Sequence, residues 1–377
     1  MKTAAKCLAF VAGAIRDLSK LVSALMLCVP LANAQTQAQA QANSGTFATF
    51  DVPGDSGGIF PTAIDFAGVV TGYFIDAGSL IHSFVRAPNG AITVFDPPGA
   101  TCSTVTQNVC STADAINLEG VVTGGYATNC SATEPPAGCE NHGFLRSPGG
   151  KYTTFDVPGQ AHDFTSPTGI NLAGTVTGSY LRSASEFAGF VRLANGIFTN
   201  FVVTGSTYTS PQAINAFGVI AGFYRDASGL LHGFVRSPDG KITTYDPPIA
   251  FLTNSPPVSI NAEGAITGSY CSDAACDTVH GFLRSANGTM KTIDAPGNNY
   301  GTSPAGINSL GVITGSYILA DFSLEHGFLW LPGGRIVTFD PPGSLYTTPT
   351  AINDRGMVVG YYCDAESVCH GFVGAPH

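Results

Sequence analysis

Charged residues are scarce in this chain, and cationic ones are the scarcest. Lys, Arg, Asp and Glu make up 11% of the 377 residues, with 16 Lys and Arg against 26 Asp and Glu. A shortage of positive charge excludes the electrostatic pattern of proteins that bind nucleic acid or anionic membranes. A phosphate-binding loop, a dinucleotide fingerprint and a His-x-x-x-His metal motif are also missing. We therefore expect no cofactor, no metal and no nucleic-acid partner.

Long apolar runs are missing as well, except near the N-terminus. There, four cationic residues precede an apolar stretch at 21–32, and Ala-Asn-Ala at 32–34 has the small-x-small pattern of a cleavage site. Residues 1–34 are therefore predicted to be a signal peptide, and the Gln- and Ala-rich residues 35–44 a disordered linker. We expect a soluble protein that is secreted or periplasmic, without a membrane span.

Repetition is what the chain has in abundance. A phrase of the type AINLEGVVTGGY occurs seven times, and its successive copies are 44 to 54 residues apart. This period is typical of one four-stranded propeller blade. The Ile residues that mark the seven copies are Ile64, Ile116, Ile170, Ile214, Ile260, Ile307 and Ile352.

Each repeat contains the signals of two hairpins. In the first, Asn or Asp stands three residues before Gly, as in Asn117 to Gly120, which suits a type I turn. The second contains Asn-Gly or a similar dipeptide, which predicts a two-residue type I′ turn. Counting outward from that turn predicts cross-strand aromatic pairs within each repeat, such as Phe84 opposite Phe95 and Phe144 opposite Phe155.

The ends of the chain complement each other. The last repeat supplies three strands, and residues 45–54 resemble the missing fourth. We therefore predict an all-β fold for residues 45–377: a single seven-bladed β-propeller of four-stranded antiparallel blades. The N-terminal strand closes the last blade in this prediction, with Phe50 near Phe372.

Eight cysteines follow the signal peptide, and they form four close pairs in the sequence. Three pairs bracket the loop between the hairpins of their own repeat, and one lies between the first two repeats. Local disulfides are expected, in agreement with export. A zinc site is the alternative, less favoured because no pair has C-x-x-C spacing and the pairs lie on different blades. The predicted disulfides are Cys102–Cys110, Cys130–Cys139, Cys271–Cys276 and Cys363–Cys369.

The phrase INxxGxVxGxY, followed by HGFxR and a Gly turn, resembles the extracellular HAF-type repeats of exported bacterial proteins. Two features depart from that family: Ser or Gly replaces Ala in His82-Ser83-Phe84 and its equivalents, and the unit ends in Phe-Asp-Pro-Pro-Gly. The resemblance covers nearly the whole mature chain and implies a propeller and export. It implies no catalytic residue.

Three residue types recur at one position in most of the repeats, and their positions on outer strands are too widely spaced to share one ligand. We interpret the His series as hydrogen-bonding between blades, and the Arg and Asp series as inter-strand or inter-blade partners. The His residues are His82, His142, His232, His280, His326 and His370, with Ala188 in the third repeat. The Asp residues are Asp51, Asp96, Asp156, Asp246, Asp294 and Asp340.

Aromatic residues precede the innermost strands on the face that carries the long loops. Phe164, Tyr208, Tyr300 and Tyr346 are the predicted ligand-binding residues, with Phe60 as a fifth. Rings beside hydroxyls and carboxylates suit glycan contacts. The alternative is that these rings wedge adjacent blades apart as core.

The leading hypothesis is an exported, monomeric, non-catalytic propeller that binds an extracellular ligand, with a glycan favoured. A hydrolase or lyase acting on a polysaccharide at the axis is the second hypothesis, with His162 and Asp163 as its catalytic candidates. A structural extracellular protein without a discrete ligand is the third.

Overall fold

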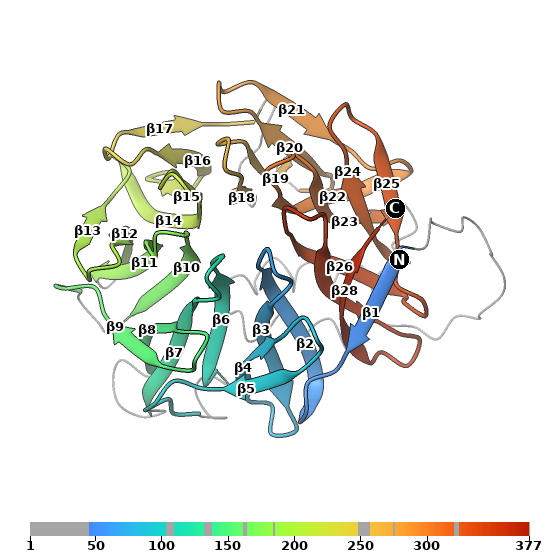
Figure 1. Cartoon of the computed structure of the whole chain (residues 1–377). Helices are drawn as coiled ribbons and strands as arrows, with labels where there is room; N and C mark the ends of the chain where they lie inside the picture. Colours follow the sequence, from blue (N-terminus) through green and yellow to red (C-terminus); the bar gives the residue numbers. More distant parts are fainter. Residues whose placement is uncertain are drawn as a thin grey trace, which may run out of the picture.

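The computed structural model describes residues 45–102, 109–131, 138–160, 164–183, 185–247, 257–273, 276–319 and 324–376. Within these ranges the chain forms 28 β-strands and no helix, so the predicted all-β class is confirmed. Nothing in the described ranges could therefore cross a bilayer as a helix. Figure 1 shows the strands following one another around a common centre, with the two ends of the described chain side by side.

Antiparallel strands pair in runs of four that follow the sequence repeats. The first three runs are β2 (Asp55–Ile64), β3 (Val70–Asp76), β4 (Ile81–Arg86), β5 (Ile92–Phe95); β6 (Ser111–Ile116), β7 (Val122–Ser131), β8 (Gly138–Arg146), β9 (Tyr152–Phe155); and β10 (Thr165–Ile170), β11 (Val176–Ser183), β12 (Glu186–Arg192), β13 (Phe198–Phe201). The next three are β14 (Ser206–Ile214), β15 (Ile220–Asp226), β16 (Leu231–Arg236), β17 (Ile242–Tyr245); β18 (Pro257–Ile260), β19 (Ile266–Cys271), β20 (Val279–Arg284), β21 (Met290–Ile293); and β22 (Asn298–Ile307), β23 (Ile313–Leu319), β24 (Glu325–Trp330), β25 (Ile336–Phe339). The last is β26 (Tyr346–Ile352), β27 (Val358–Cys363) and β28 (Cys369–Ala375), joined by β1 (Thr46–Phe50).

Strand β1 pairs antiparallel with β28, so the first and last strands of the described chain are neighbours (Figure 1). The pairing runs from Thr46 opposite Ala375 to Phe50 opposite Gly371. Phe372 lies opposite Thr49, one residue away from the register that the sequence suggested. This pairing covers a strand edge that would otherwise be free to bind other chains.

The first hairpin of each repeat has the predicted turn. The Gly120 N–H donates to the Asn117 carbonyl at 2.9 Å, and Gly120 has a φ of 74°. The Asn117 side chain accepts the Val121 N–H at 3.0 Å, which holds the bend from inside. The turn therefore has a polar first residue that caps the bend and a Gly in the left-handed conformation, as the sequence indicated.

The second hairpin differs from its prediction. The Gly90 N–H donates to the Ala87 carbonyl at 2.9 Å, and the Ala87 N–H donates to the Ala91 carbonyl at 2.8 Å, so the loop has three residues. This is a type I turn followed by a left-handed Gly, not a two-residue type I′ turn. The predicted register is therefore wrong by one residue: Phe84 lies opposite Val94, and Phe95 lies opposite Ser83.

The corrected register moves the aromatic contacts from within the repeats to the interfaces between them. In the second repeat Phe155 lies over Gly143, where an added Cβ would be 2.5 Å from the ring. The same ring meets Phe190 of the next repeat edge to face, at 6.3 Å between centroids. Equivalent contacts are Phe50–Phe84, Phe95–Phe144, Phe201–Phe234, Tyr245–Phe282 and Phe339–Phe372.

The repeated Arg residues strengthen the same interfaces, in agreement with their predicted role between blades. Arg146 lies over the ring of Phe95, 4.7 Å from its centroid, and Phe95 belongs to the preceding repeat. Such a cation–π contact adds attraction to the burial of the ring. The equivalent pairs are Arg86–Phe50, Arg192–Phe155, Arg236–Phe201 and Arg284–Tyr245.

Candidate functional site at the centre of the repeats

The first strands of all seven repeats meet at one place. Each ends in an Ile followed by Asn, or by Asp65 in the first repeat, and all of these residues except Asn353 line a cavity of about 220 Å³. Because every repeat contributes to this cavity, it marks the common centre seen in Figure 1. The residues just beyond the Asn positions, such as Leu118 and Leu172, extend its lining.

The Asn side chains around this cavity form a ring of hydrogen bonds, which we call the Asn ring. Each Asn donates its Nδ2–H to the backbone carbonyl of the corresponding residue in the next repeat, and Asn353 donates to the Asp65 carbonyl at 2.9 Å. The Asp65 side chain has no amide N–H, so the link from Asp65 to Asn117 cannot form in the same way. The other links are Asn117–Asn171, Asn171–Asn215, Asn215–Asn261, Asn261–Asn308 and Asn308–Asn353.

A β-bulge occurs two residues before the terminal Ile in each first strand. The bulge re-aims its side chain, and in two repeats the hydroxyl reaches the next first strand: Thr62 donates to the Ala113 carbonyl at 2.6 Å, and Thr168 to the Pro211 carbonyl at 3.0 Å. All seven bulge residues are partly exposed. They are Thr62, Asp114, Thr168, Gln212, Val258, Ala305 and Thr350.

Asp114 is the only acid at these seven positions. Burial raises its pKa to about 7, against the opposing effect of hydrogen bonds from Thr112 and from the Gly125 backbone. The Thr112 hydroxyl lies 3.3 Å from the carboxyl oxygen. A protonated carboxyl can donate a hydrogen bond as the Thr hydroxyls do, whereas a carboxylate can only accept. Near neutral pH this side chain therefore offers both states.

Aromatic rings lie beside this acid. Phe60 stacks on Tyr73 at 5.2 Å and meets Tyr361 edge to face at 5.1 Å. Burial raises the pKa of Tyr73 to about 12, and the charge of Asp114 adds to the rise. Tyr73 therefore lies between the Phe60 ring and Asp114. The phenols of Tyr73 and Tyr361 stay protonated at physiological pH.

A second carboxyl completes the group, on the sixth repeat. Burial raises the pKa of Glu325, although hydrogen bonds from Ser316 and Thr348 lower it in part. The Thr348 hydroxyl lies 3.3 Å from Glu325 Oε1. The charge of Glu325 in turn contributes to the raised pKa of Tyr361. We call Phe60, Tyr73, Asp114, Glu325 and Tyr361 the inner cluster; it combines ring faces with two carboxyls whose pKa values are raised by burial.

The predicted ligand-binding aromatics lie at the junctions between repeats. Tyr208 is next to Phe187 of the preceding repeat, with 4.9 Å between ring centroids, and Phe164 meets the same ring at 5.4 Å. Tyr346 lies opposite Glu325 and is 38% exposed, and Tyr300 precedes Gly301, the partner of Val279. The rings of Phe164 and Tyr208 thus both contact Phe187. Tyr300 and Tyr346 instead lie beside the third strands of the fifth and sixth repeats.

The catalytic candidates stay a prediction, and one further serine motif lacks the local fold that it would need. His162 and Asp163 lie outside the described residues. The segment Gly54–Gly58 reads Gly-Asp-Ser-Gly-Gly and matches the G-x-S-x-G pattern. Ser56 lies on strand β2 and is exposed, whereas a nucleophile elbow needs a turn from a strand to a helix.

The repeated His residues bond within their own repeats, which corrects the prediction of bonds between blades. His82 Nδ1 lies 2.7 Å from Asp96, and the other five His residues contact the equivalent Asp at 2.7 to 2.9 Å. In the third repeat Ala188 replaces His and Val202 stands at the Asp position. Both members are lost together, so the pair acts as one structural unit.

The comparisons with known proteins identify the fold only. No protein-family model and no curated protein matches this sequence. Among solved structures, a streptogramin B lyase aligns over 89% of this chain and 99% of its own, with 14% identity and a TM-score of 0.54. The β-propeller domain of the Trilobed protease from Pyrococcus furiosus aligns over 85% and 96%, with 10% identity and a TM-score of 0.56. The BP39L lectin from Burkholderia pseudomallei aligns over 89% and 99%, with 9% identity and a TM-score of 0.52. This chain therefore has a β-propeller-like fold.

Proposed function

We propose that this protein is an exported, seven-bladed β-propeller that binds a small polar ligand, a glycan in the first instance, at the inner cluster. The observation that carries the proposal is Asp114: it is the only acid at the seven bulge positions, it is partly exposed, and its pKa is about 7. A perturbed carboxyl beside aromatic rings is typical of a binding or active site.

Seven blades and closure by the N-terminal strand are part of this proposal. The pairing of β1 with β28 and the hydrogen bond from Asn353 to Asp65 both support it, because each joins the last repeat to the beginning of the chain. Export is supported by the signal-like residues 1–34 and by four disulfides, which persist in oxidising compartments. The resemblance to HAF-type repeats points the same way.

A glycan is favoured because its chemistry complements the inner cluster. The apolar faces of a sugar stack on rings such as Phe60, and its hydroxyls can donate to or accept from Asp114 in either protonation state. Tyr346 and Tyr300 remain candidates for flanking contacts at the long-loop end. The lectin among the structural neighbours is a precedent for a propeller of this size that binds carbohydrate.

The test is a glycan array with the purified full-length mature protein, followed by calorimetry on each hit. Asp114→Asn removes the titrating group with little change in volume, and we expect it to weaken binding at least tenfold. Gln212→Asn is the matched control, since it places the same residue at the equivalent bulge of the fourth repeat. Equal binding by wild type and Asp114→Asn, with unchanged melting, would show that the inner cluster is not part of the binding site.

An enzyme is the second candidate, and the same acid favours it. A carboxyl with a pKa near 7 suits a general acid in a hydrolase or lyase that acts on a polysaccharide. New reducing ends or unsaturated products, formed by wild type and abolished in Asp114→Asn, would establish this role instead of binding alone. If the protein neither binds nor cleaves any glycan of the array, the third hypothesis, a structural protein without a discrete ligand, is favoured.

A further inference from the structure

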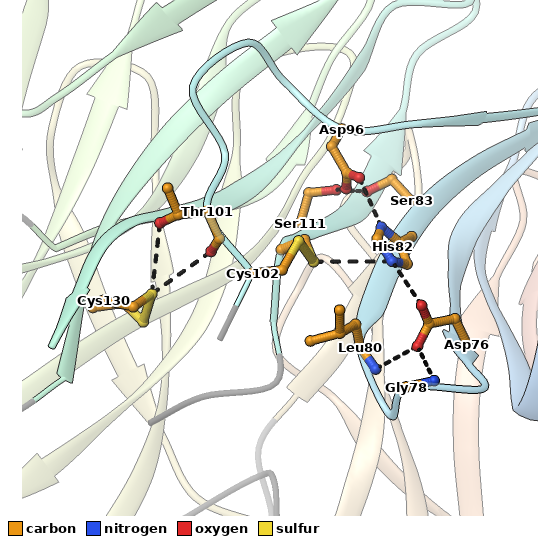
Figure 2. Close-up of a disulfide and its surroundings, with 12 residues drawn as sticks. Asp76, Gly78, Leu80, His82, Ser83, Asp96, Thr101, Cys102, Ser111 and Cys130 are labelled. Carbon is orange, nitrogen blue, oxygen red and sulfur yellow. Dashed lines mark hydrogen bonds and ion pairs between the residues drawn. A yellow bond between two sulfur atoms is a disulfide. The ribbon is translucent and has the colours of Figure 1, made fainter. Parts of the chain in front are cut away.

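One corner of the molecule, between the first two repeats, gathers ligands that zinc prefers (Figure 2). The disulfide Cys102–Cys110 lies beside His82, whose Nε2 is 4.0 Å from Cys110 Sγ. The ligand atoms of these three residues lie within 4.8 Å of one another, the only such group of His, Cys, Asp or Glu found in the described ranges. Cys110 is fully buried and Cys102 is exposed.

His82 is already oriented as a metal ligand. Its Nδ1 lies 2.7 Å from Asp96 Oδ2, and the other oxygen of Asp96 accepts the Ser111 hydroxyl at 2.6 Å. Because a carboxylate only accepts, the Nδ1 atom carries a proton and Nε2 points toward the sulfurs. A carboxylate behind the imidazole fixes the ring of most metal-binding His residues in this way.

A carboxylate oxygen beside His82 is the fourth candidate ligand. Asp76 Oδ2 lies 3.5 Å from His82 Nε2, as Figure 2 shows. The other oxygen, Oδ1, accepts the N–H groups of Gly78 and Leu80 at 2.8 Å each, which fixes the carboxylate.

We propose that this corner binds Zn²⁺ when the Cys102–Cys110 disulfide is reduced, through both sulfurs, His82 Nε2 and Asp76 Oδ2. Tetrahedral zinc places a nitrogen and an oxygen ligand about 3.4 Å apart and a sulfur and a nitrogen about 3.6 Å apart, from the usual bond lengths. The observed 3.5 and 4.0 Å are close to these values. The two sulfurs have to separate, to about 3.8 Å, which the exposed Cys102 can do, and the carboxylate of Asp76, which lies outside the group of three, has to approach the sulfurs.

The Cys102–Cys110 disulfide and the zinc-bound form exclude each other, because both need the same two sulfur atoms. A dithiol reductant gives two electrons and two protons to the S–S bond, which becomes two thiols while the reductant becomes a disulfide. Zinc then displaces both thiol protons and any proton on His82 Nε2, and the bound thiolates are protected from reoxidation. The site therefore holds either a disulfide or a metal ion.

The chain offers an internal control at the last repeat. His370 has the same two acidic neighbours, with Asp51 at 2.7 Å from Nδ1 and Asp364 at 3.5 Å from Nε2. The disulfide Cys363–Cys369 adjoins it in sequence, but these residues do not form a group of metal ligands among the described residues. His370→Asn is thus matched to His82→Asn in chemistry and setting.

The experiment uses the full-length mature protein, reduced with dithiothreitol and freed of it by anaerobic gel filtration. Cobalt(II) is titrated as a spectroscopic probe, and zinc is then added to displace it. We expect tetrahedral d–d bands and thiolate charge transfer at the first equivalent, with the affinity lowered at least 100-fold by His82→Asn and unchanged by His370→Asn. Asp96→Asn, which keeps all four ligands, should weaken binding about 10- to 100-fold.

The proposal fails if His82→Asn and His370→Asn bind the first equivalent equally, since zinc would then be held by reduced cysteine pairs in general. It also fails if the oxidised protein binds zinc as tightly as the reduced one. Circular dichroism of each reduced variant shows whether the fold survives reduction. If it does not, the same titration is made on a variant that keeps the other three disulfides and carries Cys102→Ser and Cys110→Ser, and zinc binding by that variant overturns the proposal as well.

Discussion

Two sets of polar contacts repeat around this protein, the Asn ring at the centre and the His–Asp pairs farther out, and each has one defect. In the first repeat Asp65 replaces Asn, but the Asp65 carbonyl still accepts from Asn353. In the third repeat Ala188 and Val202 replace both members of the pair. A ring whose acceptors are backbone carbonyls tolerates the loss of one donor. A pair of side chains does not, because the remaining partner would be left partly buried and unpaired.

The largest effect is expected from deleting residues 45–54, which carry β1. The deletion exposes the edge of β28 and removes both Phe50, which packs on Phe84, and Asp51, which pairs with His370. We expect loss of most of the free energy of unfolding, or aggregation, measured by urea unfolding and light scattering. A truncated protein that melts like the parent would show that β1 does not hold the ring together.

Breaking the Asn ring at an intact link should have the next largest effect. Asn215→Ala removes the donor to the Asn261 carbonyl, a buried bond, and the acceptor for the Val219 N–H, a partly buried one. We expect a loss of about 2 to 3 kcal/mol in the free energy of unfolding, since a buried carbonyl and a partly buried N–H are left without these partners. Equal stability of this variant and the parent would mean that the ring contributes little.

Repairing the ring should have a smaller and opposite effect. Asp65→Asn supplies the missing donor toward Asn117 and removes a buried carboxyl, so we expect a gain of about 1 kcal/mol. Urea unfolding measures it, with Asn308→Asp, which breaks an existing link, as the reciprocal control. A destabilised Asp65→Asn variant would show that the carboxyl has a role which the ring does not explain.

The smallest effect is expected from the outer pairs, and it depends on pH. Burial lowers the pKa of His370, but hydrogen bonds and charges from Asp51 and Asp364 outweigh it and raise the pKa overall. Protonated His370 therefore stabilises the fold below its unfolded pKa, about 6.5, and this contribution disappears as the pH rises through the folded value. His370→Asn should cost about 1 kcal/mol or less at pH 5.5 and nothing from this source at pH 9. A difference that grows with pH would contradict this sign.

The inner cluster shows what could and could not be anticipated. Aligning the seven repeats places Asp114 at a position otherwise occupied by Thr, Gln, Val or Ala, a signal available from the sequence. Its raised pKa and its proximity to Tyr73 required the packing of two repeats against each other. Phe164 and Tyr208 were predicted to lie close to the axis, and the sequence did not indicate that both rings would contact Phe187. Their sequence position did not specify on which side of the strand each ring would pack.

Local features were determined by the sequence alone. The first hairpin turn and the four cysteine pairs depend on residues fewer than ten positions apart, and the all-β class depends on such turn signals recurring along the chain. The second hairpin was predicted with the wrong loop length because Asn-Gly suits both a two-residue and a three-residue turn. Only the tertiary structure decided between them: the register that places Phe155 over Gly143 also lets its ring pack against Phe190 of the next repeat. That contact buries apolar surface between repeats, and no pattern within a single repeat encodes it.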